Sequence, residues 1–380
     1  MRSVFILLIA LVLLTSACQP QPADPALTLS PVAPRSPAPP SPSPTQPPQS
    51  SPTATPTANP VPHTATPTPL PRTTLLFTGV IVPARCVQAA IDARGNSDYP
   101  YEEVQEVISQ ADLAIGTLNA TISDYPPRTG CVPTYVLVGG AENADALQRA
   151  GFDAMSVATN HIKNCGLTNC GNRAFFDTLD NLRRVDIQPV GAGKNHAAAM
   201  QPVVLEVNGV RFGIVSLGQI ERMAFAGEQT PGIATLDEAN LRSAIAAARE
   251  MADVVIAMPH WGPEDVPMPN PSQRELARVA VEAGADLVVG NHTHVVQAIQ
   301  EINGVPVFYG LGNFVFDQDV DREHMQGAIL LVTFEGPHLV EYELIPTHVD
   351  PDGRVHLADS EESAEILERI EQVSQSLPQQ

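Results

Sequence analysis

The segment Gly284-Ala285-Asp286-Leu287-Val288-Val289-Gly290-Asn291-His292-Thr293-His294 decides the fold class of this 380-residue chain. Its apolar run, residues 287–289, is short and continuous, which is typical of a strand buried on both faces of a sheet. The preceding residues 271–283 predict a helix with Asn270 as N-cap, Pro271 in the first position and Gly284 as its stop. A helix, a buried strand and a polar loop in succession indicate an α/β domain.

The same alternation of helix and strand continues in both directions from this segment. Further buried strands are predicted at residues 75–78, 111–115, 154–158, 212–217, 254–258 and 305–309. Further helices are predicted at 142–150 and 237–252, the second with Thr235 and Glu238 spaced as a capping box. This alternation implies a largely parallel sheet. After Phe314 the pattern predicts two antiparallel strands, at 328–335 and 339–346, and then a polar, acidic, solvated helix at 361–377.

Polar residues cluster directly after three of the predicted strands. The clusters are Thr159-Asn160-His161, His260-Trp261-Gly262-Pro263-Glu264 and Asn291-His292-Thr293-His294. Ligand sites in open α/β sheets lie at the carboxyl ends of strands. We therefore expect all three clusters to project from the same edge of the sheet.

The residue types in these clusters favour a metal site over isolated core or surface histidines. His292 and His294 are two residues apart, so in an extended segment both imidazoles lie on one side and approach a common ion. Asn160, His161 and His260 would join them from the other strand ends. Imidazole suits zinc and other transition metals, and an amide oxygen is a usable hard ligand.

These segments resemble the successive motifs of the CapA family of bacterial capsule (poly-γ-glutamate) synthesis proteins. The resemblance covers nearly all of residues 73–345 and is most characteristic in Tyr309-Gly310-Leu311-Gly312-Asn313-Phe314-Val315-Phe316-Asp317. It implies a fold similar to the calcineurin-like metallophosphoesterases, an α/β sandwich of mixed sheets flanked by helices. It also implies that His161 protonates a leaving group, that Glu264 is a second catalytic candidate, and that the metal-ligand positions are Asn160, His260, His292 and His294.

The chain departs from the family pattern at two acidic positions. The family usually has Gly-Asp where this chain has Gly79-Val80, and Asn-Leu-Glu where it has Thr117-Leu118-Asn119; Asn164 is a milder change from Asp. A two-metal site holds its cations roughly 3.5–4 Å apart and needs anionic bridging ligands. We therefore expect one divalent ion, zinc or manganese, held by three imidazoles with Asn160 and Asn119. The alternative is that no metal binds and the histidines line a polar cleft.

The N-terminus predicts export. Arg2 and the uncharged apolar run 4–14, shorter than the roughly 20 residues of a membrane span, indicate a signal peptide over residues 1–17. Cys18 resembles a lipidated lipoprotein cysteine, with an ordinary signal peptide as the alternative. Residues 18–72, rich in Pro, Thr and Ser, predict a disordered tether before an α/β domain at 73–358 and an acidic tail at 359–380. We expect a lipid-anchored protein on the extracytoplasmic face of the cell membrane.

Charge and cysteine content restrict the partners and the redox environment. The formal net charge of -21 argues against nucleic acid, since phosphate binding needs clusters of Lys and Arg. It also opposes tight binding of a polyanion unless a cation neutralises the site. The even number of cysteines after Cys18 favours disulfides in an exported chain, and three pairings of the four are possible, among them Cys86–Cys131 with Cys165–Cys170. A thiolate zinc site is the alternative, but the spacing does not match one.

Export and the resemblance together predict a protein that helps to make, anchor or trim a capsule or cell-envelope polymer, with membrane synthase subunits as partners. A surviving metal site would support hydrolysis or transfer at a phosphoester, amide or γ-glutamyl bond. The alternatives are a catalytically degenerate binding or scaffold module for the polymer synthase and a metal-dependent phosphoesterase.

Overall fold

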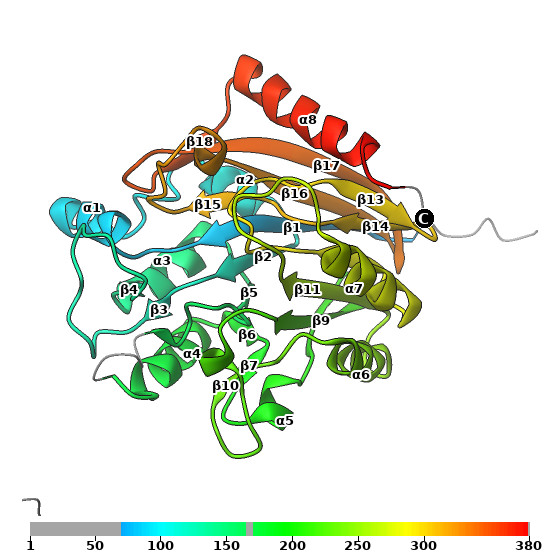
Figure 1. Cartoon of the computed structure of the whole chain (residues 1–380), viewed down its shortest axis with the longest axis horizontal. Coiled ribbons are helices and arrows are strands. Elements are labelled where there is room, and N and C mark those ends of the chain that lie inside the picture. The colour runs from blue at the N-terminus through cyan, green and yellow to red at the C-terminus, as the bar shows by residue number, and fades with distance from the viewer. Residues whose placement is uncertain (1–69, 165–169, 379–380) are drawn as a thin grey trace, which may run out of the picture. The chain divides into compact units, whose positions relative to one another are not determined.

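Two mixed β-sheets pack face to face in the computed structural model, which describes residues 70–164 and 170–378 (Figure 1). The predicted signal peptide, Cys18, nearly all of the predicted tether and Cys165 lie outside the described residues. All seven predicted buried strands are present, but they are divided between the two sheets.

The larger sheet contains the first strand of the domain near its centre. Its strands, in spatial order, are β18 (Val355–Leu357), β17 (His338–Val349), β16 (Gln326–Glu335), β1 (Arg72–Ile81), β2 (Leu113–Leu118), β5 (Ala154–Ser156) and β6 (Gln188–Val190), with β15 (Asn313–Val315) also paired to β1. The part from β1 to β6 is parallel, while β16, β17 and β18 are antiparallel neighbours, as predicted for the first two of these.

The second sheet has a parallel centre with one antiparallel strand at each edge. Its order is β13 (Ile299–Ile302), β14 (Val305–Phe308), β12 (Leu287–Val289), β11 (Val254–His260), β9 (Val210–Gly218) and β8 (Val203–Val207). Two short pairs complete the strands: β3 (Thr121–Ile122) with β4 (Val138–Gly139), and β7 (Ala192–Gly193) with β10 (Gly232–Ile233).

The strands are apolar throughout because both faces of each sheet are covered. In β1, Leu75 and Phe77 point into the core between the sheets, whereas Leu76 packs toward the helices. In β11, Val254, Ile256 and Met258 face the inter-sheet core, and Val255 and Ala257 face the other side. Side chains alternate across a strand, so a strand covered on both faces needs a continuous apolar run.

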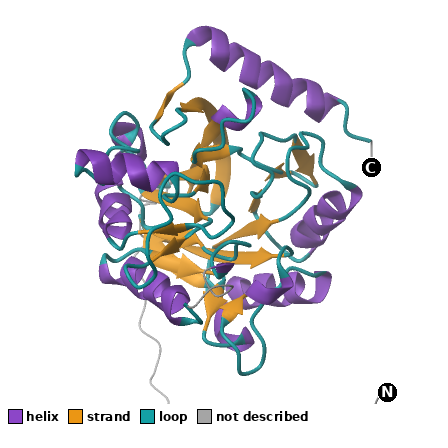
Figure 2. Cartoon of the chain, turned by 60° about the vertical axis from the view of Figure 1, so that its left-hand side comes forward, coloured by secondary structure: helices purple, strands orange, loops and turns teal. Residues whose placement is uncertain are grey.

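Helices cover the two outer faces of this pair of sheets (Figure 2). Those packed on the larger sheet are α1 (Cys86–Arg94), α2 (Gln105–Ser109), α3 (Glu142–Ala150) and α4 (Arg173–Arg184). Those on the side of the second sheet are α5 (His196–Ala199), α6 (Glu238–Arg249) and α7 (Pro271–Glu282). Short 3₁₀ turns lie at η2 (Arg222–Ala224) and η3 (Glu323–Met325). The layers confirm the predicted sandwich of mixed sheets flanked by helices.

Two helix N-caps that were predicted from the sequence can be compared with the structure. At α7 the predicted cap is confirmed, because Asn270 accepts a hydrogen bond from the Gln273 N–H and the Gln273 side chain bonds back to the cap. At α6 the predicted capping box is wrong. Asp237 is the N-cap and accepts from the Asn240 N–H, so Thr235 lies outside the helix. Thr235 and Asp237 both have a side-chain oxygen that can cap a helix. Asp237, which directly precedes Glu238, is the residue that does so.

The C-terminal helix α8 (Ser360–Gln375) is present, but its predicted solvation is wrong. Ile366 and Ile370, four residues apart, are buried against Val296. The Ser374 hydroxyl accepts a hydrogen bond from the Ile299 N–H at 2.8 Å. The helix therefore packs on the sandwich and contacts β17 of one sheet and β13 of the other (Figure 1). No helix within the described ranges is both long enough and apolar enough to cross a membrane.

The docking of α8 can be tested by truncating its buried side chain. Ile366→Ala should lower the free energy of unfolding by about 2–5 kcal/mol, because it removes a fully buried side chain and leaves a cavity. The matched control is Leu367→Ala on the exposed side of the same helix, which should change it by less than about 0.5 kcal/mol. Urea unfolding measures both. Equal effects would contradict the docked arrangement.

Candidate functional site

The two sheets meet at the predicted polar clusters. Asn160 follows β5 of the larger sheet, and His260 is the last residue of β11 in the second sheet. His260 Nε2 lies 2.9 Å from Asn160 Oδ1. The expectation of a single sheet edge is thus wrong: the clusters converge because the carboxyl ends of strands from both sheets open toward the same place.

His292 completes a group of three possible ligand atoms. Its Nδ1 lies 3.2 Å from His260 Nε2, and both rings are buried. Two atoms that bind one zinc ion at 2.0–2.1 Å lie about 3.3 Å apart in a tetrahedral site. The observed separations of 2.9 Å and 3.2 Å are close to this value. The donor set therefore fits a single transition-metal ion.

His294 and Glu264 form a second possible ligand group that shares His292. Glu264 Oε1 lies 3.8 Å from His292 Nε2 and 4.0 Å from His294 Nε2. These ligand atoms all lie within 4.8 Å of one another. Glu264, predicted from the sequence as a catalytic carboxylate, is therefore also placed where it could bind a cation beside His292.

The backbone at the two histidines differs from the extended segment that was expected. His292 has φ 106° and His294 has φ 61°, both in the left-handed region that side-chain-bearing residues adopt rarely. Strained backbone of this kind is common at functional sites. The two rings still approach a common carboxylate, but through a tight turn rather than through strand alternation.

Burial keeps the imidazoles neutral. Burial, together with the neighbouring His294 and His161 rings, lowers the pKa of His292 to about 3. Burial likewise lowers the pKa of His294 to about 4 and holds that of His260 well below its usual range. Burial raises the pKa of Glu264. A neutral imidazole has a free lone pair, which is the form that binds metals.

Asn313 orients His294, a role that the sequence analysis missed. The His294 Nδ1–H donates to Asn313 Oδ1 at 2.8 Å, which leaves Nε2 free as a ligand atom. The Asn313 amide donates in turn to the His324 carbonyl oxygen at 2.9 Å. Its position in the Gly-Leu-Gly-Asn motif was the available signal. By contrast, His260 Nδ1 is buried and has no partner within the described part of the chain.

Val80 and Asn119, where the resemblance implies acidic residues, are adjacent to residues of this group. Val80 is fully buried, and its N–H donates to the Gly312 carbonyl oxygen at 3.0 Å. A Cβ at Gly79 would lie 2.2 Å from that same oxygen, so only glycine allows the close approach. Asn119 Oδ1 accepts from the His161 N–H at 3.0 Å. Asn119 therefore supports the loop that carries Asn160 and His161, and Val80 contributes no charge.

His161 lies under an exposed tyrosine. Its ring stacks on that of Tyr135 with a centroid distance of 6.3 Å and an interplanar angle of 5°. His161 Nδ1 lies 3.2 Å from the Tyr135 carbonyl oxygen, while Nε2 forms no hydrogen bond with the described residues. Burial lowers the pKa of His161 to about 4, so the ring is neutral at neutral pH. The exposed ring of Tyr135 carried no sequence signal.

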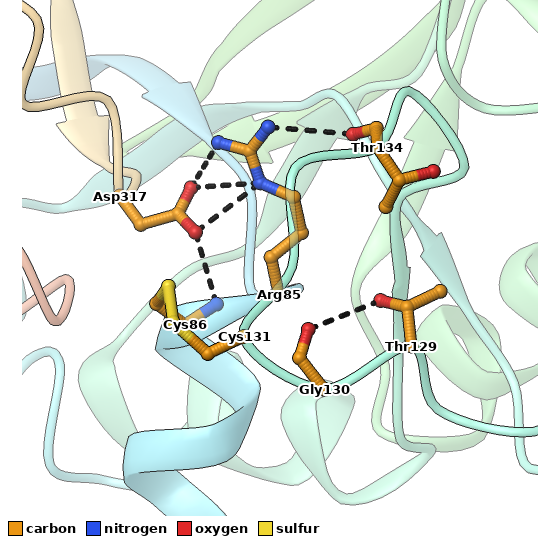
Figure 3. Close-up of a disulfide and its surroundings, with 7 residues drawn as sticks. All are labelled: Arg85, Cys86, Thr129, Gly130, Cys131, Thr134 and Asp317. Atoms are coloured by element: carbon orange, nitrogen blue, oxygen red, sulfur yellow. Dashed lines mark hydrogen bonds and ion pairs between the residues drawn. A yellow bond between two sulfur atoms is a disulfide. The ribbon is translucent and has the colours of Figure 1, made fainter.

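A disulfide anchors the loop that carries Tyr135 (Figure 3). Cys86, the first residue of α1, is bonded to Cys131, which confirms this predicted pair. Next to it, Arg85 is paired with Asp317 and donates to the Thr134 carbonyl oxygen at 3.3 Å. Cys170 is disulfide-bonded as well, and the predicted pair Cys165–Cys170 falls partly outside the described residues.

A hollow of about 420 Å³ lies beside this loop and is open to solvent. Its lining includes Arg85, Tyr135, Asp317 and Gln318. Asp319 lines it as well, and Arg85 is already paired with Asp317, so the hollow suits a polar ligand rather than an anion.

The family model described as "Bacterial capsule synthesis protein PGA_cap" matches residues 74–318. The match covers more than half of the 380-residue chain, and the chain therefore belongs to this family of bacterial capsule synthesis proteins. All seven predicted site residues and Asn313 lie within the matched region.

Individual relatives agree with the family. The chain is 30% identical over 248 residues to the PGA biosynthesis protein CapA of Bacillus subtilis (strain 168), a match covering 65% of this chain and 64% of that protein. It is 31% identical over 258 residues to the capsule biosynthesis protein CapA of Bacillus anthracis, covering 66% and 61%. The chain thus spans less than two thirds of the length of either relative.

Among solved structures, the NAD nucleotidase of Haemophilus influenzae is similar with a TM-score of 0.46 and 12% identity, covering 79% of this chain and 62% of that chain. A likeness this weak bears on neither activity nor ligand.

Removing the disulfide should loosen the Tyr135 loop. Cys86→Ser with Cys131→Ser should lower the free energy of unfolding by about 2–4 kcal/mol, because the unfolded chain regains conformational entropy when the cross-link is removed. Limited proteolysis should then cut residues 123–137 faster than in the unchanged chain. Thr129→Ala, in the same loop, is the control and should leave both readouts nearly unchanged. A cutting rate that is the same with and without the disulfide would show that the loop is held by other contacts.

His324 should make stability depend on pH. It contacts Asp321 at 2.8 Å and Asp265, the neighbour of Glu264, at 2.7 Å. Burial opposes its charged form, but the hydrogen bonds to both carboxylates outweigh burial and raise the pKa of His324 above 6.5. Its contribution is therefore complete below the unfolded pKa and is lost as the pH rises through the folded one.

His324→Gln should accordingly destabilise the protein more at about pH 5.5 than at about pH 8.5. Urea unfolding at both values measures the difference, with the exposed His338→Gln as control. A loss that is constant with pH would mean that His324 is neutral in the folded protein.

Proposed function

We propose that this protein acts in the synthesis of a capsule-type polymer at the extracytoplasmic face of the cell membrane. Family membership supports the polymer context, because the matched model describes bacterial capsule synthesis proteins and both relatives are named for PGA or capsule biosynthesis. The predicted signal peptide at 1–17 and the lipid anchor on Cys18 support the location. Membrane synthase subunits and the polymer itself are the proposed partners.

The proposed site holds one divalent ion, zinc or manganese. The observation that carries this proposal is the meeting of Asn160 Oδ1, His260 Nε2 and His292 Nδ1 at 2.9 Å and 3.2 Å. His294 and Glu264 lie near Nε2, on the other side of the His292 ring, so they are not ligands of this ion. A bound divalent ion lowers the pKa of water and polarises a carbonyl or phosphoryl oxygen.

The protein's own residues would position the substrate and donate the proton to the leaving group. Tyr135 stacks on His161, and the hollow that Tyr135 lines with Gln318 is where a polar group of the polymer could bind. A negative charge brought next to His161 raises the pKa of the ring, which would let the Nε2–H serve as the proton donor to a leaving group. The proposed reaction is hydrolysis or transfer at an amide, γ-glutamyl or phosphoester bond during anchoring or trimming of the polymer.

The second candidate is a binding or scaffold module without catalysis, and Val80 favours it. A fully buried apolar side chain stands where the family usually has an acidic ligand, and Asn119 replaces another. In this case the histidine group would hold a metal or a polar ligand for recognition only, and the synthase would be the partner.

Metal content distinguishes the proposals. In the full chain purified without chelator, His292→Ala and His260→Ala should each lose about one equivalent of zinc or manganese, because each removes a ligand from the same ion. His338→Ala, an exposed histidine on β17, should lose none. Elemental analysis measures the ion directly. Unchanged metal content in both site variants would refute the metal site.

Measurements of catalytic turnover then distinguish the proposed enzyme from the proposed scaffold module. Cleavage or transfer of poly-γ-glutamate or of a phosphoester, lost in His292→Ala but retained in His338→Ala, would establish the enzyme. Capture of synthase subunits by the metal-free protein, with no turnover in any variant, would establish the scaffold.

A further inference from the structure

A second group of histidines lies outside the candidate site, at the edge of the larger sheet. His348 on β17 stands directly opposite His356 on β18, and Asp350 follows in the turn between these strands. The two rings lie 5.0 Å apart at an angle of 32°. Because opposite residues of an antiparallel pair share a face, the imidazoles lie side by side. Together with Asp350, they bring three ligand atoms within 4.8 Å of one another.

Hydrogen bonds fix which nitrogen of each ring is free. His348 Nδ1 lies 3.0 Å from Glu362 Oε1, and His356 Nδ1 lies 3.3 Å from the Leu357 carbonyl oxygen. Both partners can only accept, so each Nδ1 carries the proton. In the neutral rings each Nε2 therefore presents a lone pair. This is the arrangement of metal-binding histidines, whose second nitrogen donates to a carboxylate or a carbonyl group.

Asp350 places a negative charge beside the free nitrogen of His356. Its Oδ1 lies 3.5 Å from His356 Nε2. A carboxylate oxygen and an imidazole lone pair repel one another unless a proton or a metal ion lies between them. A proton would satisfy only this pair, whereas a metal ion would also satisfy His348 Nε2.

We propose that His348, Asp350 and His356 bind a divalent transition metal, for which zinc is the best fit. Two imidazole nitrogens and one carboxylate are the protein ligands of an open zinc centre, with water in the remaining position. The partial exposure of all three residues gives the ion a route from solvent.

Glu362 orients the site from α8. Its carboxylate accepts from the Gln326 side chain at 2.8 Å as well as from His348, and only 12% of its side chain is exposed. The ion would therefore join the β17–β18 hairpin to the start of α8 through His348 and Glu362. The proposed role is structural: metal binding fastens the C-terminal helix to the sheet edge.

Zinc titration of the full chain tests this site separately from the candidate functional site. The parent is His292→Ala, which removes a ligand of that other site but none of this one. Isothermal titration with zinc chloride should show one site in the parent. Adding His356→Ala should weaken binding more than about 100-fold, beyond the 10–100-fold that follows from losing an outer partner. Adding His338→Ala, on the same strand but outside the group, should leave affinity unchanged.

Thermal unfolding gives a second measurement that does not require His292→Ala to fold. Zinc should raise the Tm of the unchanged chain by a larger increment than that of Asp350→Asn, a substitution of nearly equal shape. The proposal is overturned if the parent binds no zinc, if His356→Ala binds it as tightly as the parent does, or if zinc raises the Tm of Asp350→Asn by the full increment.

Discussion

The contact between His260 Nε2 and Asn160 Oδ1 joins the two sheets at the place where their strands end, and the rest of the site is built around it. The two residues belong to different sheets and are 100 positions apart in the chain. Their contact is possible because the inter-sheet core keeps β5 and β11 packed with their carboxyl ends facing the same opening. Loops from both sheets then contribute side chains to one small volume. In such an arrangement packing, not local sequence, sets the distance between ligand atoms.

The second constraint is the cost of burying several polar rings together. Three buried imidazoles remain neutral because water is excluded and because each charged ring would repel the others. Neutral rings offer lone pairs, and lone pairs this close to one another are stabilised by a shared cation. Val80 and Asn119 add no negative charge, and the only anionic donor among the predicted site residues is Glu264, which suits one divalent ion better than two. The uncharged side chains Val80 and Asn119 at the strand ends thus limit the charge that the site can bind.

The sequence predicted the elements whose signal is local. Continuous apolar runs identified the buried strands, and Asn270 with Pro271 identified the start of α7, because burial and capping act within a few residues. The sandwich of sheets followed from the family resemblance, but the assignment of each strand to one of the two sheets was missed, since a buried strand has the same apolar pattern in either sheet. The turn at His292 and His294, the orienting contact from Asn313 and the docking of α8 were also missed. Each depends on residues distant in sequence, so no local pattern encodes it.

The position of β1 in the larger sheet has a consequence for the order in which the protein can be assembled. This strand begins at Arg72, yet one of its neighbours is β16, and Arg72 pairs with Glu335 across 263 residues. Bringing such distant segments together is slow, because the entropy of closing the loop is lost before the stabilising contacts form. The first strand to be synthesised must therefore wait, unpaired on one side, for the last third of the chain. Folding of this domain is completed only after nearly all of it has left the ribosome.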